Sequence, residues 1–252
     1  MPANSKLIRD ADIVMCIDCT GSMKHTLDIV KENALKLYDD LMVAMEEKGK
    51  TLDKVRVRVI AFRDYCESVT DGNPPMLSTP FFNLPEEKEK FAASVRGLQP
   101  VGGGDDPEDG LEALGFAMSS DWRRSEGSRK CRHIIALWTD DAPHWLSAED
   151  IKKSSDPTSA KWWVDRSRVP GYPDKMAKNM EELTEWWGDG CMQKPKMPEQ
   201  NQKRLVLYAP DAGGWKFISD NWKQVVHYTT ELASGVQEYD YAAIINALES
   251  SI

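Results

Sequence analysis

The sequence predicts an α/β fold in which a mainly parallel β-sheet is covered by helices on both faces. Short apolar runs of strand length, such as DIVMCID and CRHIIALW, alternate along the chain with amphipathic segments of helical period. Continuous apolar runs are typical of parallel strands buried on both faces, and strand–helix alternation favours such a sheet. The 252 residues suit a single domain, which we expect over residues 8–252 after an N-terminal tail at residues 1–7.

Composition argues against several functional classes. The formal net charge is -9, from 32 Lys and Arg against 41 Asp and Glu, so no basic field is available to attract nucleic acid or anionic lipid. No apolar run approaches the ~18 residues that span a bilayer, and the first residues lack the apolar core of a signal peptide. We therefore expect a cytoplasmic protein that binds neither nucleic acid nor membrane.

The five cysteines do not indicate a disulfide framework. Cys16 and Cys19 form a CxxC, but Asp18 between them opposes thiolate formation, and no second cysteine pair completes a zinc site.

The first half of the chain predicts two core strands around a long helix. DIVMCID at 12–18 is the first strand, and apolar residues recur at steps of three and four from Met23 to Met45 in a helix that ends at Gly49. KVRVRVIAF at 54–62 is the second core strand. MLSTPFF at 76–82 predicts one antiparallel edge strand, because Pro80 lacks the backbone donor that a central strand needs.

The second half continues the alternation of helices and strands. Helices are expected at 85–98, from Pro107 to Met118, at 176–187 and at 239–249, and strands at 131–138, 203–210 and 224–230. Residues 146–175 are rich in Ser, Pro and charge and predict an irregular inserted loop.

Three loops that leave the carboxyl ends of predicted strands carry oxygen-bearing side chains. In parallel sheets these ends form the ligand-binding edge. The alternating Asp18, Thr20 and Ser22 of IDCTGSM place three oxygens in one tight turn, which Gly21 allows to bend. Asp105 and Asp106 follow in the second loop, and Asp140 and Asp141 in the third. An all-oxygen set of hard ligands favours Mg²⁺, with Mn²⁺ as the substitute.

These loops resemble those of the von Willebrand factor type A (VWA) domain with its metal-ion-dependent adhesion site. DCTGS is similar to that family's DxSxS, with Thr20 in the place of the first serine. GGGDDPED and TDDAPHW resemble the second and third loops of intracellular members, such as those near α-kinases. The resemblance covers the chain from residue 11 to at least residue 145. It implies a three-layer Rossmann-like fold and, in the third loop, Asp141 rather than Asp140 as the outer-shell acid of the metal site.

The second loop departs from the adhesive members of the family. Their threonine aligns near Gly104, which has no side chain, so Asp105 is the expected replacement and Asp106 the alternative. The predicted metal ligands are therefore Asp18, Thr20, Ser22, Asp105 and Asp141. An extra carboxylate would make the ion a weaker electrophile.

The resemblance implies a metal-dependent protein-binding module, without catalysis, whose ion accepts an Asp or Glu from a partner in an assembly with kinase, phosphatase or ATPase components. A magnesium-dependent phosphatase or hydrolase is the alternative, although no GxxxxGK[ST] occurs and Thr20 replaces the second carboxylate of a DxDx motif. A metal-free scaffold is a third possibility.

Simpler roles exist for the same residues. Thr20 and Ser22 are typical N-cap residues of a helix, and Asp105, Asp106 and Glu108 suit a helix start. His144 is either a general base or a contact at the rim. Six tryptophans cluster near and after the third loop, where they pack the sheet or anchor a partner: Trp138, Trp145, Trp162, Trp163, Trp186 and Trp187.

Overall fold

The computed structural model describes residues 8–66, 74–102, 107–154, 165, 169–192 and 194–230, together with Ala242, Ile245, Asn246 and Glu249. In this part of the chain seven strands form one sheet in the order β3-β2-β1-β5-β6-β7, with β4 also beside β2. Five strands are mutually parallel: β1 (Ile8–Asp18), β2 (Lys54–Phe62), β5 (Arg129–Trp138), β6 (Lys203–Pro210) and β7 (Val225–Thr230).

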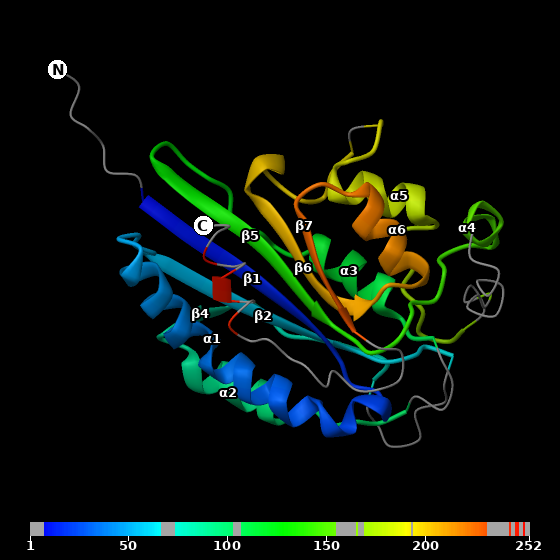
Figure 1. Ribbon diagram of the computed structural model, residues 1–252, viewed down its shortest axis with the longest axis horizontal. Coiled ribbons are helices and arrows are strands. Elements are labelled where there is room, and N and C mark those ends of the chain that lie inside the picture. The colour runs from blue at the N-terminus through cyan, green and yellow to red at the C-terminus, as the bar shows by residue number, and fades with distance from the viewer. Residues whose placement is uncertain are drawn as a thin grey trace.

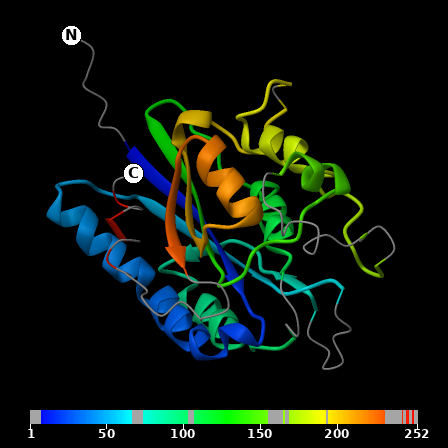
Figure 2. The ribbon, with the colours of Figure 1, turned by 45° about the vertical axis from the view of Figure 1, so that its right-hand side comes forward.

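Helices cover both faces of this sheet, as Figures 1 and 2 show. On one face lie α1 (Leu27–Glu47) and α2 (Lys88–Arg96). On the other lie α3 (Gly110–Met118), α5 (Met180–Trp187) and α6 (Gly213–Asn221), while α4 (Ala148–Lys153) lies near the edge of the molecule in Figure 1. The predicted three-layer Rossmann-like α/β fold is confirmed.

Alternation of side chains along β1 separates two hydrophobic cores. Ile13, Met15 and Ile17 pack into the core below α1 and α2, whereas Val14 and Cys16 pack into the core of α3, α5 and α6. Successive side chains of a strand point to opposite faces, so the part of a central strand that is covered on both faces is mainly apolar. This requirement explains the continuous apolar run from which the strand was predicted.

The long helix follows its predicted apolar stripe. Its buried residues are Leu27, Val30, Ala34, Leu37, Leu41 and Met45, and Met23 is buried in the short 3-10 helix Ser22–His25 that precedes it. The helix ends at Glu47, close to the predicted end at Gly49.

The structure differs from the sequence prediction at the edge strand and in the inserted loop. The edge strand predicted over 76–82 is two short strands, β3 (Met76–Ser78) and β4 (Phe82–Leu84), each antiparallel to a different part of β2. Within residues 146–175, predicted as irregular, α4 forms because the Ser147 hydroxyl accepts the Asp150 amide and caps the helix.

Two helices differ from the sequence prediction because of tertiary packing. The sequence did not predict α6, whose Gly213-Gly214 start is typical of a turn; a Cβ at Gly214 would lie 3.0 Å from Cγ of Pro143. α3 begins at Gly110 rather than at Pro107, because Glu108 pairs in an isolated bridge with Pro143. Both departures involve the third loop.

The predicted tryptophan packing is seen where the structure describes it. Trp138, Trp145, Trp186 and Trp187 are all buried, in the two cores. Trp162 and Trp163 lie outside the described residues.

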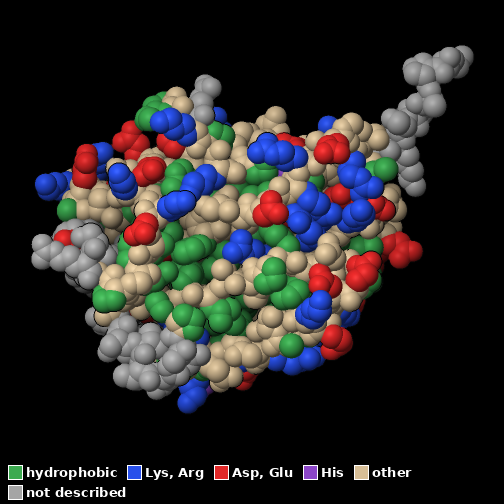
Figure 3. All heavy atoms as spheres, turned by 180° about the vertical axis from the view of Figure 1, so that it is seen from behind, with side chains coloured by type: hydrophobic (Ala, Val, Ile, Leu, Met, Phe, Trp, Pro, Cys, Tyr) green, Lys and Arg blue, Asp and Glu red, His purple; other side chains and the backbone are tan. Residues whose placement is uncertain are grey.

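The face seen in Figure 3 carries Lys and Arg side chains next to Asp and Glu, around a region of hydrophobic side chains.

Among the described helices, none has both the length and the apolar character needed to cross a membrane.

Candidate metal centre

The first and third predicted loops leave the sheet where its connections change direction, whereas the second loop lies between α2 and α3. β1 lies between β2 and β5, so the loop after β1 and the loop after β5 emerge side by side at the carboxyl ends of neighbouring strands. This is the position at which open α/β sheets bind ligands.

The first loop folds back on Asp18. Oδ1 of this carboxylate accepts hydrogen bonds from the Thr20 amide at 2.9 Å and the Thr20 hydroxyl at 2.6 Å. The Thr20 hydroxyl also lies 3.1 Å from the Ser22 hydroxyl. The alternating positions 18, 20 and 22 therefore bring their oxygens together, as the sequence pattern predicted.

The third loop joins this cluster through two side-chain hydrogen bonds. Ser22 Oγ donates to Oδ1 of Asp140 at 3.0 Å, across 118 positions of sequence. Thr139 Oγ1 donates to Oδ2 of Asp18 at 2.7 Å. Asp140, the neighbour of the predicted ligand Asp141, is thus in direct contact with the first loop.

The helix-cap interpretation of Thr20 and Ser22 is wrong. Thr26 is the N-cap residue of α1, and no side-chain hydrogen bond caps that helix or the preceding 3-10 helix. The hydroxyls of Thr20 and Ser22 contact carboxylates instead.

Backbone hydrogen bonds tie the second loop to the other two. The Gly21 amide donates to the Gly102 carbonyl at 2.7 Å, and the Glu108 amide donates to the Ala142 carbonyl at 3.1 Å. The predicted ligand Asp105 and its alternative Asp106 lie outside the described residues, so their role stays a prediction.

Several buried acidic side chains meet at the junction of these loops. Six carboxyl groups here belong to side chains that are each no more than 4 % exposed: Asp18, Asp64, Glu108, Asp109, Asp140 and Asp141. Removing a carboxylate from water is costly unless a counter-charge or hydrogen bonds compensate for it. Within the described part of the chain, Oε2 of Glu108 is buried and has no hydrogen-bond partner.

Burial and mutual repulsion disfavour ionisation at this edge. Burial is the largest cause that raises the pKa of Asp18 from 3.8 to about 6; Asp140 raises it further, and hydrogen bonds from Thr20 and Thr139 oppose the rise. Burial, followed by repulsion from Asp18, raises the pKa of Glu108 to about 12.

A hard divalent cation fits this set of side chains. The oxygens of Asp18, Thr20, Ser22 and Asp140 are linked by hydrogen bonds, and the donors are the hydroxyl and carboxylate oxygens that Mg²⁺ and Mn²⁺ prefer. Positive charge here would also offset the repulsion that raises the pKa values of Asp18 and Glu108.

The sequence prediction missed other residues of this edge. Asp64 follows β2, Glu108 precedes α3, and Thr139 follows β5. The sequence could have indicated Asp64 as a site residue, because it comes just after a buried strand, as Asp18 does. For Glu108 the sequence predicts only a favourable charge at a helix start, whereas the structure pairs its backbone with Pro143 in an isolated bridge.

The raised pKa of Asp18 predicts how stability depends on pH in EDTA. A carboxyl group whose folded pKa is raised contributes stability that is fully present below its unfolded pKa, here 3.8, and is lost as pH rises through about 6. Over this pH range the free energy of unfolding falls by roughly 3 kcal/mol because of this group. We expect thermal melts in EDTA to show that wild-type Tm falls between pH 4 and 7 relative to Asp18→Asn. Parallel profiles for the two proteins would contradict this prediction.

The CxxC cysteines do not contribute a reactive thiol. Cys16 and Cys19 are fully buried, and burial is the main cause that raises the pKa of both thiols, that of Cys19 to about 12. A thiol held in its protonated form is a poor nucleophile and a poor metal ligand.

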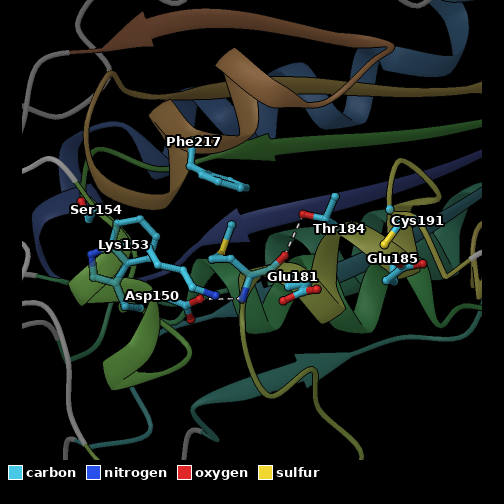
Figure 4. A pocket seen from close by; sticks show the side chains of 11 residues that line it. Asp150, Lys153, Ser154, Glu181, Thr184, Glu185, Cys191 and Phe217 are labelled. Carbon is cyan, nitrogen blue, oxygen red and sulfur yellow. Dashed lines mark hydrogen bonds between the residues drawn. The ribbon is translucent and has the colours of Figure 1, made fainter.

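The apolar pocket shown in Figure 4 is separate from the acidic edge. It has a volume of about 340 Å³ and lies between α4, α5 and α6, with Lys153, Glu181 and Phe217 among its lining side chains. None of the six buried acids of the loop junction lines it.

Comparisons with known proteins define no family for this chain. No family model matches it. A protein of Acanthamoeba polyphaga mimivirus, described as an ariadne-like RING finger protein, is 25 % identical over 141 residues, which are 55 % of this chain and 12 % of that protein.

Solved structures of pilus proteins are similar at a low level. SpaC, a pilus adhesin of Lactobacillus rhamnosus GG, matches with a TM-score of 0.49 and 12 % identity over 96 % of this chain and 30 % of the adhesin. The type V pilus tip protein Mfa5 of Porphyromonas gingivalis matches with a TM-score of 0.31 and 21 % identity over 52 % of this chain and 20 % of the tip-protein chain. Similarities this low define neither a family nor a function.

Proposed function

We propose that this chain is a metal-dependent protein-binding module similar to the VWA domains. Asp18, Thr20, Ser22 and an acid of the third loop would hold Mg²⁺ or Mn²⁺, with Asp105 as the predicted ligand from the second loop. The ion would offer one coordination position to an Asp or Glu carboxylate of a partner protein. An intracellular assembly with kinase, phosphatase or ATPase components remains the proposed setting.

The observation that carries this proposal is the contact between Ser22 and Asp140. Its 3.0 Å hydrogen bond joins loops from two neighbouring parallel strands, and Asp18 lies on the same chain of hydrogen bonds through Thr20. A buried group of oxygens from separate loops is typical of a cation site.

Two further features support a binding module over an enzyme. The third-loop histidine, His144, is buried and lies 3.2 Å from Oδ2 of Asp64, so it does not face solvent as a general base for an incoming substrate would. The mimivirus match covers a small part of a longer protein, which suits a module.

The first test measures carboxylate binding directly. A short peptide with a single aspartate, titrated into the protein with Mg²⁺ in a calorimeter, is expected to bind, and its asparagine counterpart is not. EDTA and Ser22→Ala should each abolish this binding, because both disrupt the metal centre, whereas the control Ser94→Ala on α2 should preserve it.

Two results would contradict the proposal. One is peptide binding that is unchanged by EDTA or by the exchange of aspartate for asparagine. The other is magnesium-dependent turnover of a generic phosphomonoester that Asp18→Asn abolishes, which would favour the phosphatase alternative.

A further inference from the structure

A second group of metal-ligating side chains lies beside the candidate magnesium centre. Ligand atoms of Asp64, Cys66 and His144 all lie within 4.8 Å of one another. Oδ2 of Asp64 is 3.2 Å from Nε2 of His144, and Oδ1 of Asp64 accepts the Cys66 amide at 2.6 Å. Asp64 therefore contacts the imidazole of His144 and the backbone of Cys66.

Backbone hydrogen bonds connect the segments that carry two members of this group to the start of α3. Asp64 follows β2. The residue before it, Arg63, accepts a hydrogen bond at its carbonyl from the Asp109 amide at 3.0 Å. The His144 amide donates to the Glu108 carbonyl at 2.9 Å, so the histidine is fixed to the start of α3.

Glu108 supplies an independent sign of a missing positive charge. Its side chain is 2 % exposed, and its Oε2 atom has no hydrogen-bond partner within the described residues. The carboxylates of Asp64 and Asp18 both repel it, so it lies close to the second group as well as to the first. Buried polar atoms in native proteins nearly always have a partner, and an ion is one such partner.

We propose that Asp64, Cys66 and His144 bind a second divalent cation of the zinc class, with Glu108 as a neighbouring buried carboxylate. An imidazole, a thiolate and a carboxylate are the ligands Zn²⁺ takes in proteins, whereas Mg²⁺ takes oxygen ligands only. The two neighbouring centres thus select different metals. Cys66 is exposed, which gives an ion access, and its thiol loses a proton to solvent when the metal binds.

A second cluster of Asp, Cys and His shows that these residue types alone are not sufficient to predict a metal site. Asp12, Cys131 and His133 also lie within 4.8 Å of one another. There the Asp12 carboxylate accepts hydrogen bonds from the guanidinium groups of Arg56 and Arg123, which neutralise it. A cation has no uncompensated charge to bind at that cluster, whereas Oε2 of Glu108, near Asp64, has no hydrogen-bond partner within the described residues.

Cobalt tests this proposal, because a Co²⁺–thiolate bond produces a charge-transfer absorption that oxygen ligands do not. The full chain is titrated with CoCl₂ in excess MgCl₂, so that the first centre is occupied by magnesium. We expect this absorption to rise to one equivalent and to be absent in Cys66→Ser. Zn²⁺ should abolish it by competition, and His144→Gln should weaken cobalt binding by at least about tenfold.

Matched variants separate this inference from the proposed function. Cys191→Ser removes another exposed cysteine and Ser22→Ala disrupts the first centre, so both should retain the absorption. Absence of the absorption from the wild type, or its persistence in Cys66→Ser, would overturn the second site. Failure of Mg²⁺ to stabilise the protein while the absorption appears would refute only the first centre.

Discussion

Asp18→Asn is expected to abolish the stabilisation of the protein by Mg²⁺. A ligand that binds only the folded state at 100 times its Kd stabilises that state by about 2.7 kcal/mol. For a chain of this size such a gain corresponds to a rise in Tm of roughly 5 to 10 °C. Wild type should show this rise when thermal melts in MgCl₂ and in EDTA are compared, and Asp18→Asn should melt at the same temperature in both.

The change to asparagine removes the negative charge of residue 18 but keeps the size of its side chain. Asparagine retains an Oδ1 atom that can accept the hydrogen bonds from the Thr20 amide and hydroxyl, so the first loop keeps its conformation. The control is Asp28→Asn in the first turn of α1, where the carboxylate is 88 % exposed and pairs only at 3.6 Å with Lys31. A magnesium response that survives in Asp18→Asn would exclude Asp18 as a ligand, and its loss in Asp28→Asn would show that the response is not specific to the first loop.

Asp12→Ala is expected to destabilise the protein strongly, although Asp12 lies away from the candidate centre. The Asp12 side chain is fully buried on β1 and accepts hydrogen bonds from Arg56 at 2.9 and 2.6 Å and from Arg123 Nε at 2.8 Å. Removing one member of a buried ion pair leaves the other charges uncompensated and costs about 3–5 kcal/mol. Urea unfolding at pH 7 should show this loss.

The choice of pH follows from the pKa of Asp12. Burial by itself would raise this pKa, but hydrogen bonds from Arg56 and Arg123 hold it below 3.8. The stabilisation is therefore present above pH 3.8 and is lost only as pH falls through the lower folded pKa. The comparison is Glu32→Ala, which removes an exposed pair with Lys36 and should leave the unfolding midpoint unchanged. Equal midpoints for wild type and Asp12→Ala would contradict the prediction.

The parallel sheet and the first loop were predictable from the sequence, because both depend on local patterns. An apolar run covered on both faces, as in β1, must be continuous, and the helical stripe from Leu27 to Met45 has its own period. Asp18, Thr20 and Ser22 lie within five residues, so one tight turn is sufficient to bring their oxygens together.

Contacts between distant residues required the tertiary structure. The sequence placed Asp140 and Asp141 in the same loop, but it could not show that Ser22 contacts Asp140. Asp141 and Asp105 stay predictions as ligands. The bridge between Glu108 and Pro143 was equally invisible, because sequence patterns report neighbours along the chain and not pairing between loops.

By itself, therefore, the sequence determined the layers of the fold and an acidic edge at the carboxyl ends of its strands. The tertiary structure alone decided which acids meet there and that Asp64, Cys66 and His144 form a second group beside them. The physical reason is that burial and repulsion between carboxylates depend on distances through space, which strand order and loop pairing set.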